Sequence, residues 1–219
     1  MCGRFTRHMT WRQIHDLYRI TESGNAPNLR GHSNICPTDP IVIVRDWDGK
    51  RDGAMVRWGL VPPSFDETMM KKFQNHNARS DKIDKTSWWT KPFNEGRRCL
   101  IPASGFYEWK TEGKTKIRHY VTSKSGEPLT FAGLWERNDK LNIDSATMVC
   151  TDPNELMTSI HDRMPVILAK EDWEAYLAEP RLDLLKPAPL DDLIVYPVRS
   201  KIDDDDPQES IITERTLLL

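Results

Sequence analysis

The sequence lacks long hydrophobic runs, and its opening lacks the apolar core of a secretory signal. No apolar stretch in the 219 residues approaches the ~18 that a transmembrane helix needs. The first ten residues, MCGRFTRHMT, are too polar for a signal peptide. Apolar residues account for 38% of the chain and charged residues for 29%. This composition excludes an integral membrane protein and predicts a globular one.

Cysteine is also scarce. The four cysteines, Cys2, Cys36, Cys99 and Cys150, lie far apart in the chain. They lack the close spacing that is typical of a zinc site or of a disulfide framework. We therefore expect reduced thiols, no metal site, and a cytosolic or nuclear protein.

The sequence has no excess of charge of one sign. Thirty-one basic and 33 acidic residues give a net charge of −2. This balance argues against a protein that coats nucleic acid by bulk charge, although it leaves room for a local basic groove. Tryptophan, by contrast, is plentiful, with eight residues. Its flat ring can fill a core or stack on bases.

No internal repeat, low-complexity linker or shift in composition divides the chain, so we expect one domain over residues 1–219. Several short extended runs are typical of strands. They lie at residues 41–45, 54–60, 99–101, 105–110, 117–123, 129–135 and 146–150. Glu112 and Gly113 separate two of these runs and predict a hairpin turn.

Helix signals are fewer, and they combine N-capping residues with apolar stripes. They predict helices over residues 11–20 after Thr10, from Asp152-Pro153 to about residue 161, and over residues 171–179. The segment 23–40 is rich in Gly, Asn and Pro, and we expect it to be a loop. Many short strands with few helices predict an α+β fold that is mainly antiparallel.

Cys2 offers an unusual chemistry if Met1 is removed. Its α-amine and its thiol would then lie on adjacent carbons. Such a 1,2-aminothiol condenses with an aldehyde to an imine, and the thiol then closes a five-membered thiazolidine ring. An internal cysteine cannot react in this way, because its nitrogen is an amide. The alternative is an ordinary penultimate cysteine without a catalytic role.

Four further polar residues have two interpretations each. Asn77 and Arg79 lie in the polar segment QNHNAR, which is either a solvated loop or a phosphate-binding loop. Glu108 lies between two aromatic residues. It either points to solvent or is buried, in which case its pKa rises and it becomes a candidate general acid or base. His161 either caps a helix C-terminus or takes part in catalysis.

Six motifs, MCGRFT, WGLVP, NAR, RCLIPASGFYEW, FAGLWE and HDRMPVIL, occur in this order. Together they resemble the SOS response-associated peptidase (SRAP) family of abasic-site-processing proteins. The resemblance runs from Met1 to about Val198. It implies a barrel-like, mainly β fold with a few peripheral helices, in a single domain whose motif-bearing core covers residues 1–198 and whose divergent tail covers residues 199–219. It also implies a basic groove for single-stranded DNA and no metal or organic cofactor.

The resemblance implies roles for individual residues. After loss of Met1, Cys2 would capture the abasic-site aldehyde as a thiazolidine, with a possible competing lyase reaction. The implied catalytic residues are Cys2, Asn77, Glu108 and His161. The implied DNA contacts are Arg4, Asn34, Phe65 and Arg79.

The chain departs from the family pattern in three places. Cys36 follows Asn34 in SNICP, where relatives carry N-x-A-P. Phe65 is the single aromatic residue after WGLVP, where relatives often have two. Four aspartates at residues 203–206 would repel phosphate if they bordered the groove.

Two rival functions use the same residues. One is an N-terminal-cysteine peptidase in which His161 serves as the base for Cys2. The other is a non-covalent single-stranded DNA-binding module. In either case we expect a monomer without a membrane partner, in the cytoplasm or nucleoid of a bacterium or in the nucleus of a eukaryote.

Overall fold

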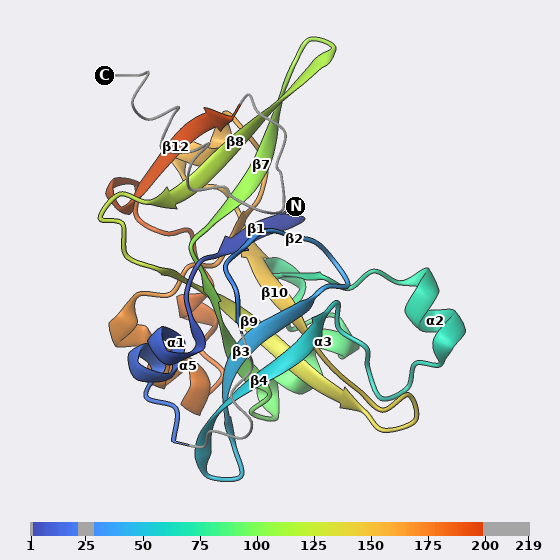
Figure 1. The fold of residues 1–219 in the computed structure, drawn as a ribbon. Helices are drawn as coiled ribbons and strands as arrows, with labels where there is room; N and C mark the ends of the chain where they lie inside the picture. Colours follow the sequence, from blue (N-terminus) through green and yellow to red (C-terminus); the bar gives the residue numbers. More distant parts are fainter. Residues whose placement is uncertain (1, 22–28, 199–219) are drawn as a thin grey trace.

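Two β-sheets carry the fold in the computed structural model, which describes residues 2–21 and 29–198 (Figure 1). The strands are β1 (Arg4–Arg7), β2 (His32–Ile35), β3 (Pro40–Trp47), β4 (Lys50–Trp58), β5 (Asn77–Arg79), β6 (Arg98–Ala103), β7 (Gly105–Glu112), β8 (Thr115–Ser123), β9 (Leu129–Asn138), β10 (Ile143–Thr151), β11 (Met164–Pro165) and β12 (Leu193–Val198). The helices are α1 (Trp11–Tyr18), α2 (Glu67–Lys72), α3 (Ser87–Asn94), α4 (Glu155–Thr158) and α5 (Trp173–Ala178), with short 3-10 turns η1 (Ser80–Lys82), η2 (Lys170–Asp172), η3 (Leu182–Leu184) and η4 (Leu190–Asp192).

One sheet closes into a small barrel. Strands β4, β3, β6, β9 and β10 pair in that order, and β10 also pairs with β4 to complete the ring. All of these pairs are antiparallel except β4 with β10. β5 and β11 add to β10 beyond the ring. The predicted α+β class, mainly antiparallel and barrel-like, is therefore confirmed.

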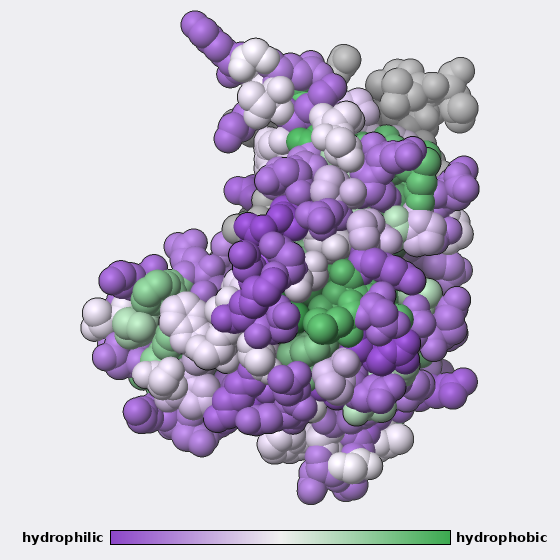
Figure 2. Space-filling view, turned by 180° about the vertical axis from the view of Figure 1, so that it is seen from behind, coloured by the Kyte–Doolittle hydropathy of each residue, from purple (hydrophilic) through white to green (hydrophobic). Residues whose placement is uncertain are grey.

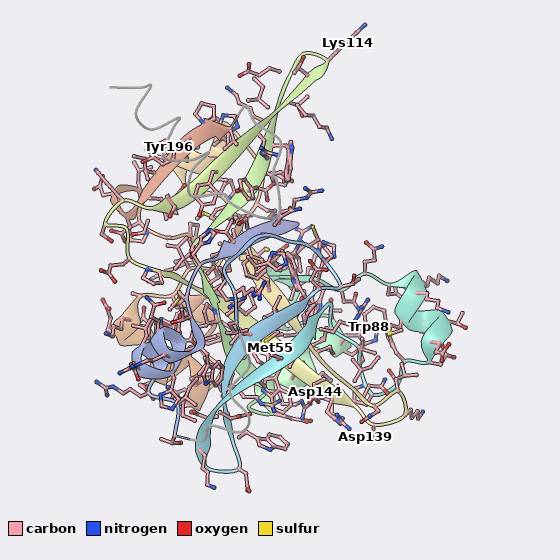
Figure 3. The ribbon with its side chains drawn as sticks, in the orientation of Figure 1. Met55, Trp88, Lys114, Asp139, Asp144 and Tyr196 are labelled. Carbon is pink, nitrogen blue, oxygen red and sulfur yellow. The ribbon has the colours of Figure 1, made fainter. Side chains whose placement is uncertain are left out.

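The other sheet has the order β12-β8-β7-β1-β2 and is antiparallel throughout. Figure 1 shows this sheet standing above the barrel, and β1 begins where the two meet. The predicted hairpin joins β7 to β8, with Glu112 opposite Thr115 and Gly113 at a φ of 60°. Its tip projects from the body of the protein, with Lys114 at its end (Figure 3).

The barrel wall is buried on both faces, which explains its near-continuous apolar strands. Ile41 and Ile43 of β3 pack in one buried cluster, while Val42 and Val44 pack in another cluster with Tyr18 of α1. Alternate residues of a strand point to opposite faces. Helices therefore cover the outer face of the barrel, and side chains fill its interior.

Three of the local predictions need correction. The segment predicted as a loop, 23–40, contains β2, whose polar sequence HSNI pairs with β1. Asp152 and Pro153 do not begin a helix. Asn154 is the N-cap, and its side chain accepts a hydrogen bond from Met157, so α4 spans a single turn. The helix expected at 171–179 is shorter, because its first residues form η2.

The surface is largely hydrophilic. Figure 2 shows the face opposite that of Figure 1, where hydrophilic side chains surround a hydrophobic patch near the middle. Among the described residues, every helix is too short or too polar to span a bilayer. The aspartates at residues 203–206 lie outside the described residues.

Candidate active site around Cys2

Strand pairing fixes the position of Cys2. The residue lies two positions before β1, which is held between β7 and β2. Arg4 pairs with Tyr107 and Phe5 with Phe106 across the β1–β7 ladder. Cys2 itself is fully buried. The start of β1 therefore directs Cys2 into the region where the sheet meets the barrel.

Asn77 ties Cys2 to the barrel. It lies on β5, which runs parallel to β10 with Asn77 opposite Met148. Its Nδ2 donates a hydrogen bond of 2.8 Å to the carbonyl oxygen of Cys2. On its other side, Oδ1 accepts a hydrogen bond of 3.3 Å from the Sγ of Cys150. Asn77 is thus a buried residue of the site rather than part of a solvated loop.

Glu108 is buried as well. Its neighbours on β7, Tyr107 and Trp109, belong to the small aromatic cluster on the other face of the sheet. Glu108 is 2% exposed, so it does not point to solvent. Burial raises the pKa of its carboxyl group to about 7. The proton of Glu108 can therefore be gained or lost near neutral pH.

His161 faces Glu108 from the loop between α4 and β11. Its Nε2 lies 3.8 Å from Oε2 of Glu108, and its side chain is 24% exposed. Burial lowers the pKa of the imidazole, which favours the neutral ring at pH 7. Nδ1 accepts a hydrogen bond of 3.1 Å from the backbone N–H of Arg163. Nδ1 also lies 2.9 Å from Oδ1 of Asp162, so each ring nitrogen has a carboxylate within reach of its proton.

The thiol of Cys2 is held in its protonated form. Burial raises its pKa well above the usual value, and the charges of Glu108 and Cys150 raise it further. A preformed thiolate, as in a cysteine peptidase, needs a depressed pKa instead.

The structure brings the four expected catalytic residues together, and their chemical roles remain predictions.

Two of the expected DNA contacts lie together. Nη1 of Arg4 donates a hydrogen bond of 3.1 Å to Oδ1 of Asn34. The Arg4 guanidinium also lies 5.7 Å from the centre of the Trp109 ring. Sequence reasoning missed Trp109. Trp109 directly follows Glu108 in GFYEW, and successive residues of a strand face opposite sides. A buried Glu108 therefore indicates that Trp109 lies on the other face of β7.

The other two expected contacts are differently placed. Arg79 forms an ion pair of 2.8 Å with Asp81, so its charge is already partly compensated. Phe65 is 1% exposed. Its ring packs edge-on against Trp88, with 4.9 Å between the ring centres, and against Phe73. Stacking of Phe65 on a base remains a prediction, and the half-buried rings of Phe73 and Trp88 are the aromatic groups that cover it.

No group of three or more His, Cys, Asp or Glu residues within 2–21 and 29–198 is arranged to hold a metal ion.

Comparison with known proteins gives consistent matches over most of the chain. Residues 1–204 match the family described as SOS response associated peptidase (SRAP). The abasic site processing protein YoqW of Bacillus subtilis is 36% identical, over 92% of this chain and 94% of its own length. The abasic site processing protein HMCES of Xenopus tropicalis is 31% identical, over 69% of this chain and 53% of its own. A crystal structure of a Bacteroides thetaiotaomicron protein shares the fold, with a TM-score of 0.83 and 23% identity over 94% of this chain and 97% of that one.

Proposed function

This chain belongs to the SOS response-associated peptidase family, and from that premise we propose that it captures abasic sites in single-stranded DNA through Cys2. One observation carries the proposal: three separate segments converge on residue 2. Asn77 holds its carbonyl oxygen, the charge of Glu108 acts on its thiol, and His161 faces Glu108. The names of the relatives, abasic site processing proteins, support the same substrate.

The chemistry begins with loss of Met1, which makes the nitrogen of Cys2 a primary amine. The abasic sugar is mostly a closed hemiacetal, so a proton must leave its hydroxyl group and another must reach the ring oxygen before the aldehyde is free. The amine then attacks the aldehyde carbon, and water leaves as the imine forms. Addition of the thiol to the imine carbon closes the ring, and the thiol proton passes to nitrogen. The net change is the loss of one water.

Glu108 and His161 have the protonation states that these steps need. With a pKa of about 7, Glu108 is present in both forms at neutral pH, so it can donate a proton or accept one. The neutral imidazole of His161 can exchange a proton with it across 3.8 Å once the groups tighten around substrate. Asn77 would hold the reacting residue in place. The same groups would catalyse the reverse reaction.

A lyase reaction competes at the imine. The imine acidifies the hydrogen on the neighbouring carbon of the sugar. Removal of that hydrogen expels the 3′ phosphate by β-elimination and breaks the strand. Rapid ring closure by the Cys2 thiol opposes this path, because the thiazolidine no longer has the C=N bond.

DNA binding would rest on the surface beside the site. Arg4, Asn34, Phe65 and Arg79 are the proposed contacts, and Trp109 offers a further ring beside Arg4. Contacts of this kind bind the strand without reading its sequence, and their strength falls as salt rises. We propose that the chain acts as one SRAP domain and as a monomer, in the nucleoid or cytoplasm of a bacterium or in the nucleus of a eukaryote.

Intact-mass measurement tests the proposal. The purified protein is weighed alone and after incubation with a single-stranded oligonucleotide that contains one abasic site. We expect loss of Met1 and a heat-stable product equal to protein plus DNA minus one water. Cys2→Ala should abolish this product and leave reversible DNA binding largely intact.

Each rival function predicts a different result. A binding module predicts equal affinity for intact and abasic strands, with no covalent product. A peptidase predicts hydrolysis of an added peptide that depends on Cys2. Retention of Met1, or the same adduct from Cys2→Ala, would overturn capture through an N-terminal cysteine.

A further inference from the structure

Cys150 is a buried thiol that the proposed chemistry does not use. It lies near the end of β10, where the parallel ladder with β5 sets it opposite Arg79 and two residues beyond the partner of Asn77. The residue is fully buried, like Cys2. The two cysteines are far apart in sequence, and the pairing of β5 with β10 brings Cys150 to the same site.

The contacts of Cys150 and Asn77 form a chain of hydrogen bonds that ends on residue 2. The Cys150 thiol donates to Oδ1 of Asn77 at 3.3 Å, and Nδ2 of Asn77 donates to the carbonyl oxygen of Cys2 at 2.8 Å. The carbonyl group of residue 2 is therefore held by Asn77, whose amide is in turn held by Cys150.

The direction of these hydrogen bonds follows from the state of the thiol. Burial raises the pKa of Cys150 to about 12, so the sulfur keeps its hydrogen at neutral pH and can donate it. An amide has an acceptor end and a donor end. With Oδ1 of Asn77 turned to the thiol, Nδ2 must face the Cys2 carbonyl. The reverse orientation would set two oxygens against each other.

We propose that Cys150 is a positioning residue, which orients the Asn77 amide and through it holds residue 2 for reaction. This inference rests on the proposed function, because it concerns the amine that forms when Met1 leaves. The nitrogen that attacks the aldehyde belongs to the residue whose carbonyl oxygen Asn77 holds. Cys150 forms no bond to substrate, and its thiol hydrogen stays on sulfur throughout.

Single-turnover capture of an abasic oligonucleotide tests the role, with Cys150→Ala, Cys150→Ser and Cys99→Ala compared in the full-length chain. Cys150→Ala should lower the saturating rate about fivefold, the factor supplied by one neutral hydrogen bond of ordinary strength. The DNA concentration at half-saturation should stay unchanged, because the thiol lies beneath the site. Cys150→Ser keeps a donor and should restore most of the rate.

Cys99→Ala is the matched control. Cys99 is equally buried and packs against Gly133 in the barrel. Its removal costs a similar cavity, so it should lower the melting temperature without slowing capture. Parent-like capture by Cys150→Ala, equal slowing by Cys99→Ala, or failure of Cys150→Ser to restore the rate would each overturn the positioning role.

A second measurement separates this inference from the proposed function. Hydrogen exchange of the Asn77 side-chain amide, followed by NMR without DNA, should be faster in Cys150→Ala and close to the parent rate in Cys150→Ser and Cys99→Ala. If the parent captures no DNA yet shows this pattern, the proposed function falls, while the orientation of the Asn77 amide by Cys150 stands. If exchange in Cys150→Ala is unchanged, the positioning role falls whatever the parent does.

Discussion

Two buried glutamates of this protein differ in the side chain that faces each carboxyl group. Glu136 on β9 is 4% exposed and forms an ion pair of 2.9 Å with Nε of Arg97. Glu108 on β7 is 2% exposed and faces the imidazole of His161 at 3.8 Å. Burial raises the pKa of both carboxyl groups, but Arg97 lowers that of Glu136 in return.

The comparison teaches what distinguishes a structural carboxylate from one suited to proton transfer. A permanent cation such as Arg97 lowers the pKa of Glu136 and so opposes the effect of burial. His161 is neutral near pH 7, so it does not compensate the charge of Glu108 in this way. Burial raises the pKa of Glu108 to about 7 even though the N-terminal amine lowers it in part, so its proton moves in the pH range where the protein would act.

The largest expected difference between the two glutamates is in the rate of capture. Glu108→Gln should slow adduct formation about a thousandfold, within the range that general acid–base catalysis supplies. Glu136→Gln should leave the rate unchanged, because Glu136 pairs with Arg97 in the barrel. Rates are measured by quenching the reaction with an abasic oligonucleotide at set times and separating the adduct on denaturing gels. Equal rates for the two variants would show that Glu108 is no better suited to proton transfer than Glu136.

The next difference is in stability. The folded-state pKa of Glu108 is about 7, above the value near 4.5 of an exposed carboxyl. The folded state therefore binds this proton more tightly, so the free energy of unfolding falls as pH rises from about 4.5 to about 7. At about 1.4 kcal/mol per pKa unit, the loss is about 3 kcal/mol. Glu108→Gln should recover it at pH 8 and change little at pH 4.5.

Urea unfolding at both pH values measures this effect. Glu136→Gln is the control, and it should show no gain at pH 8, because it removes the charge that faces Arg97. A gain of the same size in both variants would mean that burial alone, and not the partner, sets the cost.

The smallest difference is in the pH dependence of capture. Capture needs the free amine, whose pKa is about 7.7–8.0, and the protonated form of Glu108. The rate should rise toward neutral pH, pass a maximum between pH 7 and 8, and fall about tenfold by pH 9. Glu108→Gln should keep the rise and lose the fall, whereas Glu136→Gln should keep both. A profile that still falls in Glu108→Gln would assign the descending limb to another group.

The sequence predicted the parts of the fold whose burial shows in local patterns. Residues 41–44 form a continuous apolar run because both faces of β3 are buried. β2 could not be found in this way, since only alternate residues of HSNI are buried and its pairing with β1 is long-range. The helix start at Asp152 was wrong because Asn154 offers an equally good cap two residues later.

The same limit applies to the site. Asn77, Glu108 and His161 were expected from residue type and from family motifs, and the structure adds their mutual geometry. Cys150 could not be singled out among four cysteines, because its contact with Asn77 exists only across the β5–β10 ladder. Phe65 packs against Trp88, which lies on α3. Because α3 is a separate element from the WGLVP segment that leads to Phe65, the sequence around Phe65 did not indicate this burial.

The place of β1 inside its sheet has a mechanical consequence. A captured strand would be tied to residue 2, just before β1, and β1 is paired on one edge with β7 and on the other with β2. An enzyme that translocates along the DNA and pulls on this tether would load both ladders lengthwise, so their hydrogen bonds would bear the force together. A tether on β12 or β2, at the sheet edges, would let one strand peel away bond by bond. The crosslink would thus be anchored where the sheet resists traction best.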